Sequence, residues 1–297
     1  MKNVNQPVFG LFGVFSGLRS AVVSPLLFMA ALFFPGTAVA TDNLAITWQG
    51  SWQQGGLLLG RVPQEYRVRY GGVDLPITST GEFLLGLPRV AEKQIVLEVV
   101  APGKAPTTLN FDVATRSYDI QRIEGVPSDR VIPPESVLAR IRSEAGEVVR
   151  ARSLRDKSAV FLAGFKPPMQ RPLTGVYGSQ RVYNGVPKNP HYGVDYAAPT
   201  GAKVLAPASG VVTLAHDDMF YSGGTLIVDH GHGLSSSFLH LSKILVAQGD
   251  AITRGQEIAE VGASGRATGP HLDWRMNLRD VRIDPLLVLQ ALPALDE

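Results

Sequence analysis

Short apolar runs separated by turn residues fill the chain from residue 41 to residue 127. Runs such as LAITW, YRVRYGG and KQIVLEVV have the length and composition of strands, and Gly, Pro and Ser stand between them. This pattern predicts a small all-β module of sandwich type. Nothing in it has metal-ligand spacing, so we expect a packing or binding module in which Trp48 and Trp52 are core or surface aromatics.

A helical pattern replaces the strands between residues 128 and 157. Apolar residues recur near helical spacing and predict an amphipathic helix that Gly146 weakens; they are Val137, Leu138, Ile141, Val148 and Val149. The other face carries the arginines Arg140, Arg142, Arg150, Arg152 and Arg155. We expect a basic, solvated linker helix, with contact to an acidic wall polymer or partner as the alternative.

Strand-like runs return from residue 158 and continue toward residue 297, with almost no helical periodicity. Gly and Pro separate these runs, which include Phe161-Leu162 and residues 210–214, 224–228, 236–241 and 257–261. We therefore predict a second, larger all-β domain of antiparallel sheets over residues 158–297.

The first 40 residues have the features of a secretory signal. Lys2 and Arg19 lie in a stretch without acidic residues, an apolar run covers residues 21–34, and Ala38-Val39-Ala40 supplies the small residues of a cleavage site. The apolar core is short for a bilayer span of about 20 residues. We therefore predict cleavage before Thr41 rather than an uncleaved anchor.

Composition narrows the partners and the compartment. The net charge of +2 and the absence of any long block of like charge give no reason to expect a nucleic-acid partner. The chain has no cysteine, which excludes disulfides, thiolate metal ligands and a lipidated N-terminal cysteine. Export without disulfides fits the periplasm or envelope of a bacterium. No second apolar segment is long enough to cross a membrane, so we expect no membrane span in the mature form.

All 6 histidines lie between residues 191 and 271. His191 and Asp195 are four residues apart in PHYGVDYAAPTG, and in an extended segment this even separation keeps both side chains on one side. An imidazole and a carboxylate are suitable zinc ligands, although such a pair is commonly only hydrogen-bonded. In GPHLDWRM, strand geometry places His271, Asp273 and Arg275 on one face.

A further histidine, His240, ends the apolar strand SSFLHLS, where a lone histidine would most often be structural. In chain order the motifs are H-x-x-x-D, a strand ending in H-L-S, and G-P-H-L-x-W. Together they resemble the lysostaphin/LytM-type zinc metallopeptidases of bacterial cell walls. The similarity covers about residues 175 to 280, including HYGVDYAAPTGAKVLAPASGVV and GGTLIVDHGHGLSSSFLHLS.

The resemblance implies a LytM-type β domain and one zinc ion held by three protein ligands, with water or hydroxide in the open fourth position. His191 and Asp195 match the first two ligand positions. His240 matches the strand-end catalytic histidine, and His271 matches the catalytic first histidine of an H-x-H pair. The third ligand position, the second histidine of that pair, is Asp273 in this chain.

A carboxylate at position 273 keeps the capacity to bind zinc. Two carboxylates and one neutral imidazole would nevertheless leave the centre formally neutral instead of singly positive, and a less positive centre acidifies water and polarises a carbonyl less well. From Asp273 we therefore expect a retained metal with reduced activity or a changed optimum.

The function implied is a zinc endopeptidase that hydrolyses peptide bonds in peptidoglycan cross-links or stems during cell-wall remodelling. Zinc would lower the pKa of bound water. Of His240 and His271, one would act as the base for this water, and the other would stabilise the oxyanion or protonate the leaving amine. The sequence does not say which histidine has which role. The alternative is a catalytically silent LytM-type domain that binds peptidoglycan or activates another wall hydrolase, with other envelope proteins as partners. A third interpretation is a carrier domain of the biotinyl or lipoyl type, which is modified on an exposed lysine. It leaves the histidines and aspartates unexplained, and this chain has no lysine in the context that such a domain needs.

Two further residues are candidates for the substrate groove. Arg181, in GSQRVYNG, could contact substrate carboxylates, and Tyr221 lies on a predicted loop that could form a groove wall. The remaining histidines are expected in turns, with structural or exposed roles; they are His216, His230 and His232.

Overall fold

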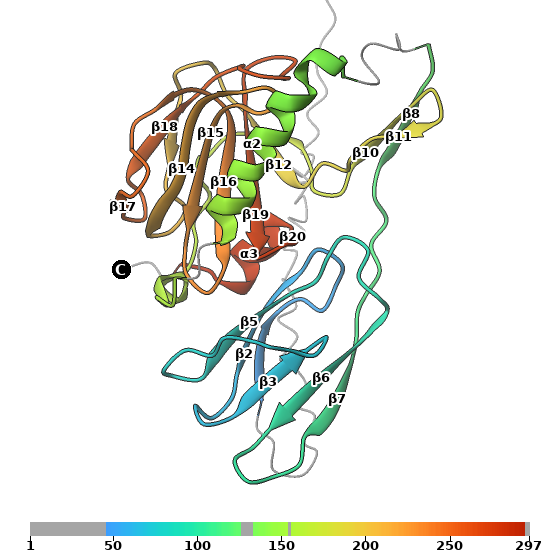
Figure 1. The fold of residues 1–297 in the computed structure, drawn as a ribbon, viewed down its shortest axis with the longest axis vertical. Coiled ribbons are helices and arrows are strands. Elements are labelled where there is room, and N and C mark those ends of the chain that lie inside the picture. Colours follow the sequence, from blue (N-terminus) through green and yellow to red (C-terminus); the bar gives the residue numbers. More distant parts are fainter. Residues whose placement is uncertain (1–45, 126–132, 154–155, 295–297) are drawn as a thin grey trace, which may run out of the picture. The chain divides into compact units, whose positions relative to one another are not determined.

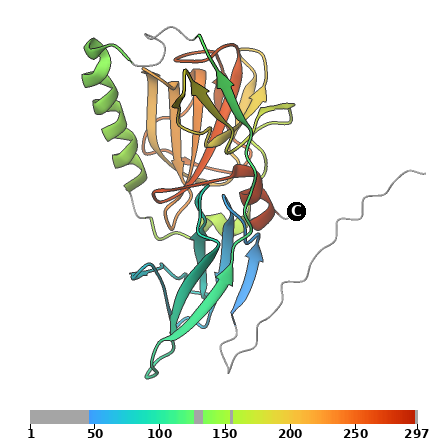
Figure 2. The same ribbon diagram turned by 90° about the vertical axis from the view of Figure 1, so that its right-hand side faces the viewer.

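The computed structural model describes residues 46–125, 133–153 and 156–294, which all fall within one compact unit (Figures 1 and 2). The predicted signal over residues 1–40, its cleavage site before Thr41, residues 128–132 at the start of the predicted linker, and residues 154–155, which include Arg155, lie outside the described residues. None of the helices in the described ranges combines the length and apolar character needed to cross a bilayer.

Eight strands form the N-terminal part. They are β1 Thr47–Gly50, β2 Leu57–Arg61, β3 Arg67–Tyr70, β4 Val73–Asp74, β5 Glu82–Gly86, β6 Gln94–Val100, β7 Thr107–Asp112 and β8 Ile120–Ile123. β1, β2 and β5 form one antiparallel sheet, and β4, β3, β6 and β7 form another. Alternation along β6 buries Ile95, Leu97 and Val99, and Ile95 and Leu97 meet Leu58 and Leu85 of the first sheet.

The two tryptophans of this part lie at the edge of the core between the sheets. Trp52 stacks on Phe111 with ring centroids 4.3 Å apart, and Trp48 meets both rings edge-on. Because these rings are occupied with one another, they contribute to packing rather than forming an open ligand platform.

The C-terminal part is built on a large sheet. Its elements are η1 Val160–Ala163, β9 Leu173–Gly175, β10 Gln180–Tyr183, β11 Val186–Pro187, β12 Gly193–Ala197, β13 Lys203–Leu205, β14 Gly210–Met219, β15 Gly223–Asp229, β16 Leu234–Ile244, β17 Ala251–Ile252, β18 Glu257–Val261, β19 His271–Leu278, β20 Val281–Ile283 and α3 Pro285–Ala291. The main sheet has the order β17-β14-β15-β16-β19-β12-β9, with β13, β18 and β20 attached to it. β10 pairs with β11 and, in parallel, with β8.

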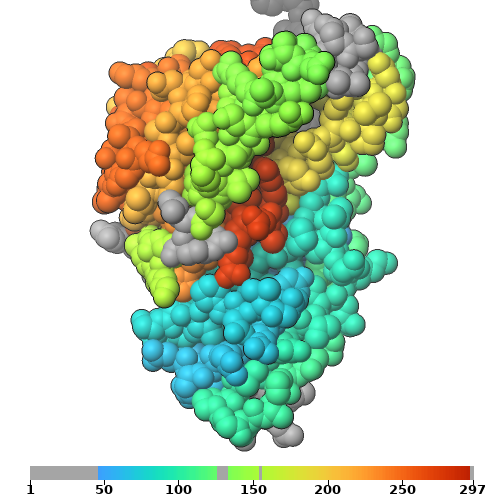
Figure 3. Space-filling view, in the orientation of Figure 1, coloured from blue at the N-terminus to red at the C-terminus, as the bar shows by residue number. Residues whose placement is uncertain are grey.

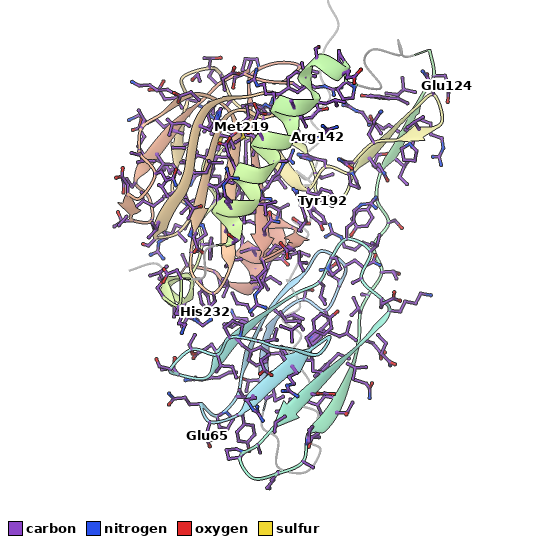
Figure 4. The ribbon with its side chains drawn as sticks, in the orientation of Figure 1. Glu65, Glu124, Arg142, Tyr192, Met219 and His232 are labelled. Atoms are coloured by element: carbon purple, nitrogen blue, oxygen red, sulfur yellow. The ribbon has the colours of Figure 1, made fainter. Side chains whose placement is uncertain are left out.

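The central strands of this sheet are covered on both faces. β15 is buried along its whole length, as a two-sided strand must be. One face contributes Leu226, Phe238 and Trp274 to the main hydrophobic core. On the other face, α2 (Glu135–Ser153) lies across the sheet, and its Ala151 belongs to one hydrophobic cluster with Leu214, Met219 and Ile227 of β14 and β15 (Figures 3 and 4). The prediction of a mostly β fold with antiparallel sheets is confirmed.

Several local expectations were wrong. The predicted helix is present as α2, which continues through Gly146, but it is not a solvated linker, because Glu144 and Ala151 are buried where it packs on the sheet. Residues 160–163 form the short helix η1 instead of a strand. α3 was missed, although Asp284 caps it by accepting from the Leu286 N–H and Pro285 opens it, both ordinary helix-start signals.

Candidate metal centre

Strands β12 and β19 bring two carboxylates opposite one another. In their antiparallel ladder Asp195 pairs directly with Asp273, so both side chains point to the same face of the sheet. His271, two residues before Asp273, shares that face. His191 precedes β12 and is held there by its backbone N–H, which donates to the Ser179 carbonyl at 2.8 Å.

The side chains of His191, Asp195 and Asp273 converge. The Nε2 atom of His191 lies 3.1 Å from Oδ1 of Asp195 and 3.4 Å from Oδ1 of Asp273. One possible ligand atom from each of the three residues lies within 4.8 Å of the others. His191 Nε2 and Asp195 Oδ1 are buried but lack hydrogen-bond geometry toward any partner. Two close, buried and misaligned polar atoms fit ligands of one cation better than a hydrogen-bonded pair, and this donor set suits zinc.

All three histidines of the site are oriented by their backbone surroundings. In each ring Nδ1 lies within hydrogen-bond distance of a backbone carbonyl, at 3.3 Å for His191, 2.9 Å for His240 and 2.8 Å for His271. Those carbonyls belong to Val176, Ser264 and Gly269. A carbonyl can only accept, so we assign the proton of each neutral ring to Nδ1, which leaves the Nε2 lone pair free to bind a metal or take a proton.

The electrostatics of the cluster favour a cation. Burial alone would lower the pKa of His191, but the carboxylates of Asp195 and Asp273 raise it to about 10. Burial would likewise raise the pKa of Asp273, but the Arg275 guanidinium and the His191 imidazole hold it below its ordinary value. The same two carboxylates that stabilise a proton on His191 would stabilise a metal ion bound at its Nε2.

His240 lies at an irregularity of β16. The strand pairs with β19 up to Leu239 and with β18 from Leu241, so His240 stands where the strand changes partner. It adopts φ 64°, a left-handed conformation that is uncommon outside glycine, and its N–H donates to the Ser222 carbonyl at 2.8 Å. This turn in the backbone brings its ring to the His271 ring, with centroids 4.8 Å apart. Burial lowers the pKa of His240, which favours its neutral form.

Two glycines make room for the carboxylates. A Cβ atom on Gly175 would lie 2.1 Å from Oδ2 of Asp195, and one on Gly193 would lie 2.6 Å from Oδ1 of Asp273. Both glycines lie on strands that flank or contain the site, β9 and β12. Sequence reasoning assigned them no role, and only the strand register shows why a side chain would collide there.

The groove candidates have different surroundings. Tyr221 is partly exposed in the turn between β14 and β15, next to Ser222, and the Arg266 guanidinium lies 5.5 Å from its ring centroid. Arg181 is exposed on β10, two residues after Ser179, whose carbonyl holds the His191 backbone. Tyr221 is therefore linked to the His240 side of the site, and Arg181 to the loop that carries His191.

The other histidines lie apart from the cluster. His230 is fully buried between the Ser209 carbonyl and the Ser236 hydroxyl, each 2.8 Å from a ring nitrogen. His232 is also buried, with Nε2 3.1 Å from the Lys157 carbonyl. His216 lies within β14, not in the turn that was expected. The H-x-H spacing of His230 and His232 thus serves packing.

A set of potential metal ligands beside two histidines with free Nε2 atoms is typical of hydrolases that activate water at a metal. A family model described as Peptidase family M23 matches residues 189–285, which contain all five site residues. A solved structure from Pseudomonas aeruginosa, assigned to peptidase M23, is 30% identical, with a TM-score of 0.62 over 81% of this chain and 95% of that one. The chain belongs to peptidase family M23, and the resemblance to LytM-type peptidases is confirmed.

Two curated relatives have functional names. Peptidoglycan DD-endopeptidase ShyB of Vibrio cholerae is 38% identical over 124 residues, 42% of this chain and 26% of ShyB. DD-carboxypeptidase/endopeptidase Mpg of Neisseria meningitidis is 36% identical over 107 residues, 36% of this chain and 24% of Mpg. The chain therefore spans about a quarter of the length of the curated relatives it matches.

Proposed function

We propose that the chain is a zinc-dependent peptidoglycan endopeptidase, exported to the periplasm or envelope of a bacterium. The observation that carries this proposal is the convergence of His191, Asp195 and Asp273 beside two histidines whose Nε2 atoms are free. Membership of peptidase family M23 and the names of ShyB and Mpg support the peptidase activity and the peptidoglycan substrate.

In this proposal His191, Asp195 and Asp273 would hold one zinc ion. When bound, zinc would polarise the scissile carbonyl and make water a better nucleophile near neutral pH. His240 and His271 lie together at the edge of this cluster, and each is oriented so that Nε2 points away from its backbone partner.

The two histidines differ in ways that suggest separate roles. His271 Nε2 lies 4.0 Å from Oδ1 of Asp195, so it faces the side of the cluster where the proposed ligands converge. His240 is kept neutral by burial, and its Nδ1–H is occupied by the Ser264 carbonyl. We assign His271 as the base that takes the proton of the attacking water, and His240 as the group beside the developing oxyanion.

The test is digestion of purified peptidoglycan by the mature chain, residues 41–297, with zinc present and the products separated by chromatography and mass spectrometry. Conversion of cross-linked peptide dimers to monomers would support an endopeptidase, and His191→Ala is the matched inactive control. If wild type binds peptidoglycan tightly with zinc loaded but releases no peptide, it is the non-catalytic binding or activating domain instead. Fractionation of cells expressing the full chain tests export.

A further inference from the structure

On β19 the face that carries His271 and Asp273 continues with Arg275, which contacts the proposed third ligand, Asp273, directly. Its Nε donates to both oxygens of Asp273, at 3.0 and 3.1 Å, and its Nη2 donates to Oδ2 at 2.5 Å. The Asp273 side chain is 3% exposed and that of Arg275 is 24% exposed. This is a largely buried, multiply hydrogen-bonded ion pair at the edge of the metal cluster.

We propose that Arg275 is a positioning residue for the metal centre, and that Asp273 and Arg275 act as one unit in place of a neutral histidine ligand. The inference rests on the zinc site of the proposed function. In it Arg275 holds the Asp273 carboxylate so that Oδ1 faces His191, and it supplies the positive charge that a second carboxylate removes.

Both carboxylate oxygens accept from Arg275 Nε, but they differ in their other neighbours. Oδ1 lies 3.4 Å from His191 Nε2, toward the convergence point of the cluster, while Oδ2 receives the shortest Arg275 hydrogen bond. A planar guanidinium fixes the plane of a carboxylate in a way that a single ammonium cannot. Carboxylates that bind metals are commonly held by such outer hydrogen bonds, whose loss typically lowers metal affinity about 10–100-fold.

The neighbouring strand is shaped for this pair. Gly193 of β12 stands opposite Arg275, and a Cβ there would lie 2.6 Å from both Arg275 Cγ and Asp273 Oδ1. The glycine therefore leaves space for the arginine stem to lie along the sheet beside the carboxylate. A side chain at position 193 would displace Arg275 or Asp273.

Charge makes the two residues interdependent. Counting only zinc ligands, Asp273 leaves the centre formally neutral, whereas adding Arg275 restores a single positive charge, as with a neutral histidine at position 273. The physical reason for expecting weak activity therefore disappears when the pair is counted as a unit. Other cations lie close by, since Arg152 and Arg282 both interact electrostatically with Arg275, and Asp273 offsets this repulsion.

A double-mutant cycle tests the inference on the mature chain. Zinc affinity is measured by competition with a chromophoric chelator for wild type, Arg275→Met, Asp273→His and the double variant. Arg275→Met should weaken zinc binding about 10–100-fold when Asp273 is present. With His at position 273 the same change should instead leave affinity unchanged or increase it, because it then removes only a repelling cation.

A second variant guards against misfolding. Arg275→Lys keeps the positive charge but loses the planar set of guanidinium donors. With Asp273 present it should weaken zinc binding less than Arg275→Met does. With His at position 273 it should not weaken zinc binding. Melting temperatures of the zinc-free proteins report any general destabilisation. Equal fold-changes in both backgrounds would overturn the pairing while leaving the zinc enzyme intact. Failure of wild type to bind zinc would overturn the proposed function and this inference with it.

Discussion

At the scale of single residues, the site depends on how backbone contacts orient three imidazoles. The Nδ1 atom of each ring lies near a backbone carbonyl, so what Nε2 faces distinguishes His191 from His240 and His271. Nε2 of His191 faces both carboxylates within 3.4 Å, whereas Nε2 of His271 is 4.0 Å from the nearer one. The same imidazole chemistry is thus placed to bind a metal at His191 and to act beside the metal cluster at His240 and His271.

From this difference we expect His240→Ala and His271→Ala to retain zinc and to lower kcat, by roughly 10²–10⁴ for the proposed base His271 and by roughly 10²–10³ for His240 beside the oxyanion. His191→Ala should lose zinc and activity together. Metal analysis alongside peptidoglycan digestion checks both, with His216→Ala as a histidine control away from the cluster. Zinc loss in His240→Ala would show that this residue is a ligand.

Space at Gly193 is a second residue-scale requirement. Gly193→Ala places a methyl group 2.6 Å from Asp273 Oδ1, Arg275 Cγ and the Trp274 carbonyl, so the β12–β19 ladder must shift. We expect a loss of about 1–3 kcal/mol in unfolding free energy, as for overpacking, and weaker zinc binding. Chemical denaturation and chelator competition measure these. Gly146→Ala in α2, whose added Cβ would meet only the end of the flexible Arg150 side chain, is the control, and equal behaviour of the two variants would contradict the argument.

At the scale of elements, α2 is connected to the turn beside His240. Glu144 accepts from the Phe220 N–H at 2.8 Å and from Arg140 Nε at 2.6 Å. The same turn contains Ser222, whose carbonyl accepts from the His240 N–H. A helix that the sequence indicated only as a solvated linker therefore helps to hold the backbone of a site histidine.

Glu144→Ala should leave the Phe220 N–H without its partner and cost about 1–3 kcal/mol of stability. Because the turn supports His240, we also expect a lower kcat with zinc affinity unchanged. Thermal unfolding and peptidoglycan digestion measure the two effects. Arg142→Ala, on an exposed position of the same helix (Figure 4), serves as the control, and a Glu144→Ala enzyme with full kcat would show that the turn does not depend on the helix.

At the scale of the whole molecule, the large sheet that carries the site also buries a titratable residue in the core, His230. His230 is buried against the Phe165 ring, with its two nitrogens on Ser209 and Ser236. Burial lowers its pKa to about 4, and its hydrogen bond to the Ser209 carbonyl offsets this only in part. The folded state therefore favours the neutral form of His230, although this residue is not one of the five residues of the candidate site.

This burial predicts a pH dependence of stability. Between about pH 6.5 and pH 4 the unfolded chain binds a proton at residue 230 that the folded chain does not, so stability falls as the pH decreases through this window. His230→Gln should be less stable than wild type at pH 7 but lose less stability on acidification. Urea unfolding of both zinc-free proteins at pH 7 and pH 5 gives the comparison. Parallel losses would show that His230 is protonated in the folded state.

Much of the site was predictable because strand periodicity acts over short distances. H-x-D-x-R necessarily places His271, Asp273 and Arg275 on one face of any strand. The role of Arg275 was not predictable, since a charged residue on such a face could equally point to solvent. The helix α3 was missed because its seven residues are too few for a periodic signal, and η1 because short apolar runs do not distinguish strand from helix.

The sequence by itself determined the mostly β fold, the family, and the residue types at each position of the H-x-x-x-D, H-L-S and G-P-H-L-x-W motifs. Those follow from local alternation and from fixed spacing along the chain. The tertiary structure alone decided the register that sets Asp195 opposite Asp273, the glycines that leave them space, and the contact of Arg275 with a carboxylate. The reason is physical: a charge or a ligand atom acts through distance in space, and only the paired strands bring residues 193–195 and 273–275 within that distance.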